Sequence, residues 1–344
     1  MTDPEIGSMP PTPDKVTIYE VARRAGVSIA TVSHVLNRPE RVSALTRGRV
    51  LDVVDELGFT PKNSAVALAR KGVGRIGVVA PFTSYPSYSA RLVGVLEACR
   101  NSNLDVVVFD VPSAAAATSP LLHSLPTTGR LDGLLIMGVP LEDSMARRLA
   151  QRKLHTVLID SHHKDFASVT VDDEAGGYRI GRHLTDRGHQ HFVFVSEPQE
   201  STDYVSAGQL RLRGFQRALD EGRPDSQPVH WVMTTPDLRG GEEAAAFISA
   251  MSERPDAVFG HHDVLAAGVL KGLRAGGIRV PEEIAVVGYD GSDLADGLDM
   301  TTVSQPFTET GRIGAGLLLQ LLGGTGSAVQ QITLAPELVV RSTA

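Results

Sequence analysis

The stretch Val16–Asn37, VTIYEVARRAGVSIATVSHVLN, determines the fold expected for the N-terminal part of the chain. Thr17 and Glu20 lie three residues apart, which is the spacing of a capping box, so we expect a first helix to begin after Thr17. Gly26 can adopt the positive φ of a tight turn, and Ser28 can cap a second helix that runs to the end of the stretch. Two short helices joined by a turn that contains glycine predict a helix-turn-helix.

A third helix is expected to complete a small three-helix bundle. Ser43 or Thr46 can cap this helix and Gly58 follows it, while its apolar residues recur at helical spacing: Val50, Val53, Val54 and Leu57. The bundle leaves small and polar residues of the second helix outward: Ser28, Ala30, Thr31, Ser33, His34 and Asn37. Such side chains suit entry into the major groove of DNA, and a solvated face of an ordinary bundle is the alternative.

Charge is unevenly distributed along the 344 residues, whose formal net charge is −7. Residues 15–71 hold ten basic against five acidic side chains, whereas residues 72–344 hold 23 basic against 32 acidic ones. Because attraction to phosphate is local, the basic segment can bind nucleic acid although the whole chain is acidic. From charge alone, the alternative is that the basic residues of 15–71 are clustered by chance.

The remaining composition excludes several classes of protein. A single cysteine, Cys99, excludes a disulfide framework and a cysteine-rich zinc site. No run approaches about 18 consecutive apolar residues, so no transmembrane helix is expected. Residues 1–14 contain four prolines and three acidic residues without a basic or apolar leader segment. They therefore predict a disordered tail rather than a signal peptide, and a cytoplasmic protein.

From residue 75 onward, short apolar runs alternate with amphipathic segments, which predicts a doubly wound α/β fold with parallel strands. The expected strands cover residues 76–80, 104–109, 133–137, 156–159, 192–195, 257–259 and 284–288. The expected helices cover residues 88–100, 143–151, 176–187, 210–221, 241–251, 264–275 and 309–322. Ligands of such sheets bind at the carboxyl ends of the strands, where we expect loops 81–87, 160–163, 196–206, 261–263 and 290–294.

Motifs that could indicate catalysis or a cofactor lack the required context. Residues 72–77 spell G-x-G-x-x-G but precede a strand instead of following one. The histidine pairs at 162–163, 189 with 191, and 261–262 lack the spacing of a helical metal site, and no G-x-S-x-G is present. We therefore expect no enzyme, no cofactor and no metal ion. An α/β enzyme that acts on a sugar is the alternative.

Residues Val16–Asn37 resemble the DNA-binding headpiece of the lactose/galactose repressor (LacI/GalR) family of transcriptional regulators. The resemblance implies that Ile29, Ala30 and His34 read base pairs. His34 stands where most members carry arginine, which can bond guanine bidentately as histidine cannot. The other headpiece residues that the resemblance places on DNA are Thr17, Ile18, Tyr19, Ser28, Thr31, Ser33 and Asn37.

Residues 61–70, PKNSAVALAR, resemble the hinge helix of the same family. The resemblance implies that Asn63 and Ala65 contact DNA and that Leu68 inserts between base pairs in the minor groove. A helix of about two to three turns is marginal alone in water, so this segment is expected to fold only on DNA. A core position is the alternative for Leu68.

The chain from residue 75 resembles the effector domain of that family, which has the type I periplasmic-binding-protein fold. The matching motifs are VDD at 171–173, RLRGF at 211–215, PEEIAVVGYD at 281–290 and TTVSQP at 301–306. The resemblance implies two subdomains around a ligand cleft, residues 75–171 with 303–330 and residues 172–302 with 331–344. The implied effector-binding residues are Tyr85, Ser87, Tyr88, Asp160, Arg211, Trp231, His262, Asp263 and Asp290.

Several of these residues could instead have a purely structural role. Trp231 is more often a core residue than a sugar platform, and an aspartate or arginine at a strand end can be a cap or a surface ion pair. His262 replaces the asparagine that usually precedes the aspartate of the family. The carboxylates and the guanidinium suit a polyol, because they accept from and donate to hydroxyl groups.

The expected organisation is a headpiece at 15–60, a hinge helix and linker at 61–74 and an effector-binding and dimerisation domain at 75–344. The expected function is that of a homodimeric repressor, released from a pseudopalindromic operator in double-stranded DNA by a small sugar-like effector. A corepressor-dependent regulator is the alternative within the class. A sugar-binding protein without a DNA function is the alternative outside it.

Overall fold

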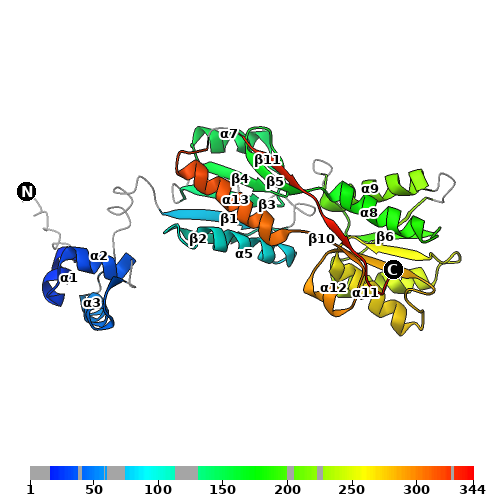
Figure 1. Cartoon of the computed structure of the whole chain (residues 1–344), viewed down its shortest axis with the longest axis horizontal. Helices are drawn as coiled ribbons and strands as arrows, with labels where there is room; N and C mark the ends of the chain where they lie inside the picture. The colour runs from blue at the N-terminus through cyan, green and yellow to red at the C-terminus, as the bar shows by residue number, and fades with distance from the viewer. Residues whose placement is uncertain are drawn as a thin grey trace, which may run out of the picture. The chain divides into compact units, whose positions relative to one another are not determined.

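The computed structural model describes residues 16–37, 41–57, 59, 74–112, 131–199, 205–222, 228–326 and 329–344 (Figure 1). The chain divides between residues 73 and 74 into two compact units, each with its own apolar core.

The first unit is a bundle of α1 (Ile18–Ala25), α2 (Ile29–Asn37) and α3 (Ala44–Leu57). Its core is built from valines and alanines that recur at helical spacing: Val21, Ala22, Ala25, Val32, Val35, Val50 and Val53. Between α1 and α2, Gly26 has a φ of 62°, and the Thr31 N–H donates to Ser28 Oγ at 3.1 Å. The helix-turn-helix and the serine cap are thus present as expected.

The capping box expected at the start of α1 does not form. The Thr17 backbone is extended, as at an N-cap, but its side chain makes no capping hydrogen bond. The N–H of Glu20 donates to the Thr17 carbonyl oxygen at 3.0 Å, so the group that the Thr17 hydroxyl would cap is already satisfied. The Glu20 carboxylate instead lies 3.5 Å from Arg23 Nη2.

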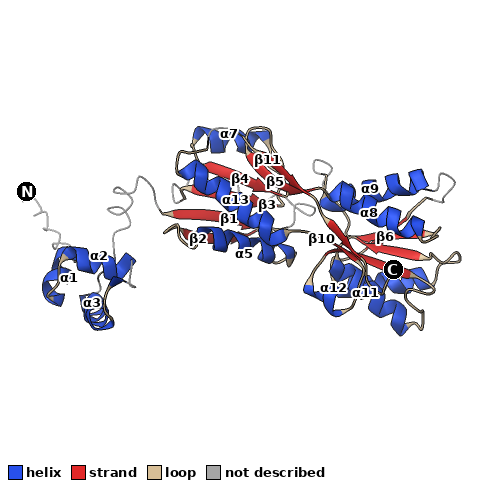
Figure 2. Ribbon diagram, in the orientation of Figure 1, coloured by secondary structure: helices blue, strands red, loops and turns tan. Residues whose placement is uncertain are grey.

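The second unit contains two six-stranded sheets (Figure 2). The first has the order β11-β5-β4-β3-β1-β2 and is parallel throughout. Its strands are β1 (Arg75–Ala80), β2 (Asp105–Asp110), β3 (Gly133–Met137), β4 (His155–Ile159), β5 (Ala167–Val171) and β11 (Gln331–Leu334). The helices that belong to this first subdomain are α5 (Ser87–Cys99), α7 (Asp143–Gln151) and α13 (Phe307–Leu322).

The second sheet has the order β12-β10-β9-β8-β6-β7, and only the β10–β12 pair is antiparallel. Its strands are β6 (Phe192–Ser196), β7 (His230–Met233), β8 (Ala257–Gly260), β9 (Ala285–Asp290), β10 (Thr302–Ser304) and β12 (Glu337–Val339). The helices of this second subdomain are α8 (Asp173–Asp186), α9 (Ala207–Gly222), α10 (Leu238–Ser249), α11 (Asp263–Ala275) and α12 (Asp293–Gly297).

The central strands of each sheet are buried on both faces, which explains their continuous apolar runs in the sequence. Along β3, Leu135 packs with α5 and α13 on one face, whereas Leu134 and Ile136 pack with α7 on the other. Successive side chains of a strand point to opposite faces, so a strand covered on both sides needs apolar residues at every position. The doubly wound α/β fold is confirmed.

The subdomain boundaries differ from those expected at two of the three crossings. Strand β10 (302–304) belongs entirely to the second sheet, so the second crossing follows it instead of lying at 303. Residues 331–334 form β11 beside β5 in the first sheet, and the third crossing lies beyond them, as the red C-terminal segment in Figure 1 shows. The Asp172 N–H, which donates to the Leu334 carbonyl oxygen at 3.0 Å, helps to hold β11 there.

Candidate functional site

The outward residues of α2 are arranged as a surface that could contact DNA. Ile29 is 41% exposed, and Ala30 and His34 are also exposed. The hydroxyl groups of Ser28 and Thr31 lie 2.9 Å apart at the start of the helix. The other predicted DNA-contact residues of α1 and its cap, Thr17, Ile18 and Tyr19, lie at the surface or partly buried. The side chain of Asn37 and the hinge residues Asn63, Ala65 and Leu68 lie outside the described residues.

The second unit contains a cavity of about 440 Å³ where the carboxyl ends of the strands of both sheets meet. Seven of the nine predicted effector-binding residues line this cavity: Tyr85, Ser87, Tyr88, Asp160, Arg211, His262 and Asp290. Nine further polar residues in its wall were not predicted to bind effector: Arg91, Ser161, His162, Thr170, Asp173, Glu197, Ser206, His261 and Gln305. Glu197 and His261 lie in loops 196–206 and 261–263, which were expected at this end of the strands. The position of Arg91 within helix α5 instead depends on how the helices pack, for which sequence spacing carries no signal.

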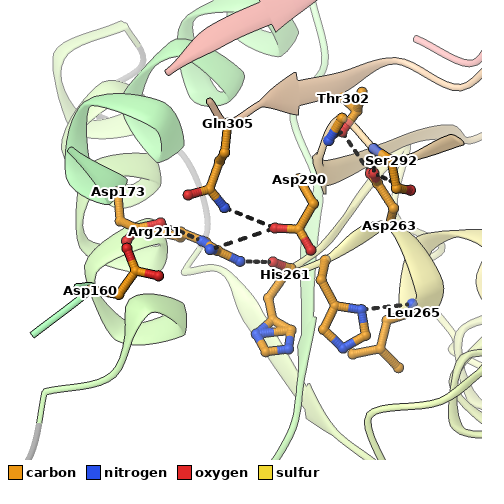
Figure 3. Close-up of polar contacts among 12 residues, drawn as sticks. Asp160, Asp173, Arg211, His261, Asp263, Leu265, Asp290, Ser292, Thr302 and Gln305 are labelled. Carbon is orange, nitrogen blue, oxygen red and sulfur yellow. Dashed lines mark hydrogen bonds and ion pairs between the residues drawn. The ribbon is translucent and has the colours of Figure 1, made fainter. Parts of the chain in front are cut away.

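Arg211 is the most heavily bonded side chain of the cavity (Figure 3). It comes from α9, and its Nε donates to Asp173 Oδ1 at 2.8 Å, while Nη1 donates to the His261 carbonyl oxygen. Its Nη2 lies 3.8 Å from Asp290 Oδ1, and its guanidinium carbon lies 3.8 Å from the centre of the Tyr289 ring. These contacts fix the plane of the guanidinium. Burial lowers the pKa of Arg211, but Asp173 and Asp290 outweigh burial, so the net pKa is raised and the group stays charged.

Asp290 ends strand β9 with a φ of 119°, a backbone conformation that costs free energy for a residue other than glycine. Its Oδ1 accepts from Gln305 Nε2 at 2.9 Å. Burial raises the pKa of Asp290 to about 7, although the charge of Arg211 opposes the shift. The carboxyl group can therefore exchange a proton or a hydrogen bond with a ligand near neutral pH.

We expect the Asp290→Asn variant to lose less stability than the wild type as the pH rises. The folded-state pKa of Asp290 is raised to about 7. The stability linked to its proton is therefore fully present below the unfolded-state pKa of about 4 and is lost as the pH rises through the folded-state value. Thermal unfolding at pH 5 and pH 8 measures the difference, with Asp293→Asn, at an exposed position on α12, as control. Equal losses in wild type and Asp290→Asn would contradict the assignment.

A second arginine–carboxylate pair lies on the first-subdomain side of the cavity. Arg91 of α5 is 3% exposed and forms an ion pair with Asp160, which follows β4. The Arg91 guanidinium carbon lies 4.2 Å from the centre of the Phe307 ring. Burial raises the pKa of Asp160, against the opposing charge of Arg91. The cavity thus has one buried arginine–carboxylate pair from each subdomain.

Close helix crossings position both arginines. A Cβ atom at Gly311 of α13 would lie 1.9 Å from the Arg91 carbonyl oxygen, and one at Gly177 of α8 would lie 1.9 Å from the Arg211 carbonyl oxygen. Only glycine lets these backbones approach so closely.

We therefore expect Gly311→Ala to lower the free energy of unfolding by about 2–3 kcal/mol, since the helices must separate. Gly316→Ala on the same helix is the matched control, because a Cβ there meets no atom within 4 Å. Alanine is the better helix former, so the control is expected to be neutral or stabilising by up to about 1 kcal/mol. Urea unfolding of both variants checks this, and an equal effect of the two would contradict the crossing argument.

Two histidines follow β8 in the cavity wall. The His262 Nδ1 accepts from the Leu265 N–H at 3.1 Å and so caps α11. Burial, together with the charge of Arg211, lowers the pKa of His262 to about 3. Burial, together with His262, lowers the pKa of His261 well below its usual value. Both rings are therefore neutral at physiological pH.

Tyr85 and Glu197 connect the two subdomains across the cavity. Tyr85 belongs to the loop between β1 and α5, and its hydroxyl donates to the carboxylate of Glu197, which follows β6. Burial raises the pKa of Glu197, whereas the bond from Tyr85 lowers it. The bond closes part of the cavity by direct contact between the two subdomains.

Two predicted effector-binding residues lie outside the cavity lining. Asp263 is buried, and its carboxylate accepts from Thr302 Oγ1 at 2.6 Å and from Ser292 N at 2.7 Å (Figure 3). It is thus engaged in joining α11 to the loops after β9 and before β10. Trp231, on the edge strand β7, is 43% exposed and donates from Nε1 to Ser196 Oγ at 2.6 Å. The sequence spacing could not show that both side chains point away from the cavity.

Comparison with known proteins assigns the chain to a family. Residues 17–62 match the family described as bacterial regulatory proteins, lacI family, and residues 182–344 match the periplasmic binding protein-like domain. The HTH-type transcriptional regulator DegA of Bacillus subtilis is 30% identical over 334 residues, which is 95% of this chain and 97% of that protein. The chain belongs to the LacI family. It is a DNA-binding transcriptional regulator of that family.

Solved structures of LacI-family proteins share the whole architecture. The Lac repressor dimer bound to operator and the anti-inducer ONPF is 29% identical, with a TM-score of 0.75 over 96% of this chain and 99% of that one. The complex of the transcriptional regulator CelR with cellobiose is 26% identical, with a TM-score of 0.68 over 96% of this chain and 100% of that one. The predicted family and fold are confirmed.

The described residues of this LacI-family chain contain neither a membrane-spanning helix nor a metal-binding cluster. No helix among them is both long and apolar enough to cross a lipid bilayer. No three histidine, cysteine or acidic side chains in the same residues are grouped so that they could hold a metal ion.

Proposed function

We propose that this LacI-family regulator is a homodimeric repressor that leaves its operator when a small, hydroxyl-rich effector binds in the cavity of the second unit. The proposal rests on two buried ion pairs in one cavity. The first subdomain contributes Arg91 with Asp160, and the second contributes Arg211 with Asp173. Carboxylates accept from hydroxyl groups and guanidinium groups donate to them, so the wall suits a sugar. The cavity volume of about 440 Å³ is within the usual range of small-molecule sites.

The relatives support the class of ligand and of assembly. CelR has been solved in complex with cellobiose, and the Lac repressor dimer has been solved bound to operator. In this chain, a dimer would present two α2 helices to adjacent major grooves of a pseudopalindrome. A ligand held by both subdomains would change their arrangement and hence the affinity for DNA, which is a coupling free energy between two sites.

We propose that the effector lowers the affinity of the protein for its operator. When operator binding is measured with and without effector, a rise in this affinity is the other outcome. We also infer that the protein acts on DNA in the cytoplasm and does not convert its ligand. Incubation of the protein with a bound sugar, followed by product analysis, tests the last point. Recovery of the unchanged sugar is expected, and turnover would contradict it.

We expect His34→Arg to change the base preference at one position of each operator half-site. His34 is exposed on α2, and arginine there could bond guanine bidentately, a contact worth about 1–3 kcal/mol in discrimination. Selection of binding sites from random double-stranded DNA, with wild type and variant in parallel, measures the preference. Identical selected sequences would refute base reading by His34.

A further inference from the structure

Buried polar atoms without a hydrogen-bond partner gather at the effector cavity. Of the described residues with such atoms, four line it: Arg91, Ser161, His261 and His262. A buried polar group without a partner destabilises the folded state, so a cluster of such groups needs a specific reason. A ligand that supplies the missing partners is the physical reason that fits their common location.

Arg91 and Arg211 differ in how far their donors are used. Nε and Nη1 of Arg211 both donate to protein atoms. In Arg91, only Nη2 pairs with Asp160, whereas Nε and Nη1 are buried without a partner. The Tyr88 and Phe307 rings, with centres 5.1 and 4.2 Å from the guanidinium carbon, hold Arg91 in place but accept no ordinary hydrogen bond. Arg91 therefore keeps two donor groups for a ligand.

His262 offers a donor of the same kind from the second subdomain. Its Nδ1 accepts the Leu265 N–H, so in the neutral ring the proton lies on Nε2. That Nε2–H group is buried and has no partner. Because Nδ1 is occupied as a helix cap, the ring cannot reverse its donor and acceptor roles without losing the cap.

The charges of the wall decide what kind of acceptor these donors meet. Among the described lining residues, four carboxyl groups (Asp160, Asp173, Glu197 and Asp290) stand against the two guanidinium groups. Arg91 is already paired with Asp160, and Arg211 with Asp173, so no positive charge remains to balance an anion. An acidic or phosphorylated ligand would add to the excess of carboxyl groups.

We propose that Arg91 and His262, one from each subdomain, donate hydrogen bonds to oxygen acceptors of an uncharged sugar, and that Arg91 determines the specificity for it. This inference rests on the proposed function of the cavity. The carboxyl groups of the wall accept hydrogen bonds from the sugar hydroxyls, and Arg91 and His262 donate hydrogen bonds to oxygen atoms of the sugar. Sugar acids and sugar phosphates are excluded by charge.

Calorimetric titration of the full-length protein tests the proposal. The probes are D-glucose, D-galactose, D-ribose and cellobiose, with D-glucuronate, D-galacturonate and D-ribose 5-phosphate as the charged counterparts. At least one neutral sugar is expected to bind, and its charged counterpart is expected to bind at least about 10-fold more weakly. Tighter binding of a charged counterpart would overturn the proposal.

The variant Arg91→Met with Asp160→Asn removes the donors and the buried partner charge together, so that no carboxylate is left unpaired. We expect its affinity for the bound neutral sugar to fall by about 30-fold or more, because the sugar loses two charge-assisted hydrogen bonds from Arg91 and the charged acceptor at Asp160. Affinity within about 3-fold of the wild type would overturn the role of Arg91 and leave the proposed function intact. Arg312→Met, at an exposed arginine of α13 paired with Glu309, is the control and is expected to bind as the wild type does.

Two single variants keep the test decisive if the double variant does not fold. Arg91→Lys retains the charge beside Asp160 but offers a single nitrogen, so the affinity is expected to fall by about 10-fold. His262→Ser retains an oxygen to cap α11 but removes the Nε2–H donor of the ring, with a similar expected loss. Wild-type affinity of both would overturn the proposal, and failure of every probe to bind the wild type would overturn the proposed sugar function as well.

Discussion

The Arg211→Gln variant is expected to bind operator DNA like the wild type and to lose its response to effector, with an affinity for effector lower by about 100-fold or more. Arg211 joins Asp173, the His261 carbonyl oxygen and Asp290 in one wall of the cavity. Glutamine is shorter and uncharged, so Asp173 and Asp290 lose the cation between them. Operator binding relies on the separate first unit, which contains none of these residues.

Fluorescence anisotropy of labelled operator, with and without effector, separates the two activities of this variant. Arg217→Gln is the matched control, because Arg217 lies on the same helix and pairs with Glu174 at the surface. The Arg217 side chain is 49% exposed. Such a pair contributes little, about 0–1 kcal/mol, and the control is expected to respond normally. A normal response of Arg211→Gln would contradict the role of the cavity. Circular dichroism of both variants verifies that the second unit is folded, since removal of a buried partner can destabilise it.

Removal of residues 1–73 has the largest effect that we expect on DNA binding, a loss of about 1,000-fold or more. The chain divides at this point, and the helix-turn-helix with its exposed α2 lies entirely within the removed part. The remaining unit has its own cores and an acidic balance, so it has neither a recognition helix nor a basic segment. Effector binding is expected to be retained, because every lining residue of the cavity is numbered above 84.

The comparison requires the truncated and full-length proteins at equal dimer concentration over a range of salt. The affinity of the full-length protein is expected to fall steeply with salt, since the basic segment displaces counterions from phosphates. Operator binding by the truncated protein with unchanged affinity would place the DNA site elsewhere. Loss of effector binding on truncation would show that the two units are not separable as described.

The sequence allowed much of this fold to be predicted, because the decisive signals are local. Gly26 defines the turn of the helix-turn-helix by its backbone preference and Ser28 by its side-chain cap, and both act in the structure as expected. The apolar runs of the central strands reflect burial on both faces. The short strands β10, β11 and β12 carry no such run, because each has partly exposed positions. For this reason the subdomain crossings at 303 and 331 were misplaced.

The candidate site was predictable where a residue's place follows from a strand end. Asp160 and Asp290 follow or end strands of the two sheets and lie in the cavity. Arg91 could not be found in this way, because its place depends on how closely α5 approaches α13 at Gly311. Asp263 was predicted to bind effector because it lies at a strand-to-helix turn, but it does not line the cavity. Its carboxylate instead accepts hydrogen bonds from Thr302 and Ser292.

The decisive measurement is the affinity of the full-length protein for a selected operator, measured by anisotropy with and without the neutral sugar that it binds. The DNA site is selected from random duplexes with the purified protein. We expect a pseudopalindromic site and an operator affinity that falls by about 5- to 150-fold when the cavity is filled. Selection of no specific site, or an operator affinity that the bound sugar leaves unchanged, would contradict this expectation.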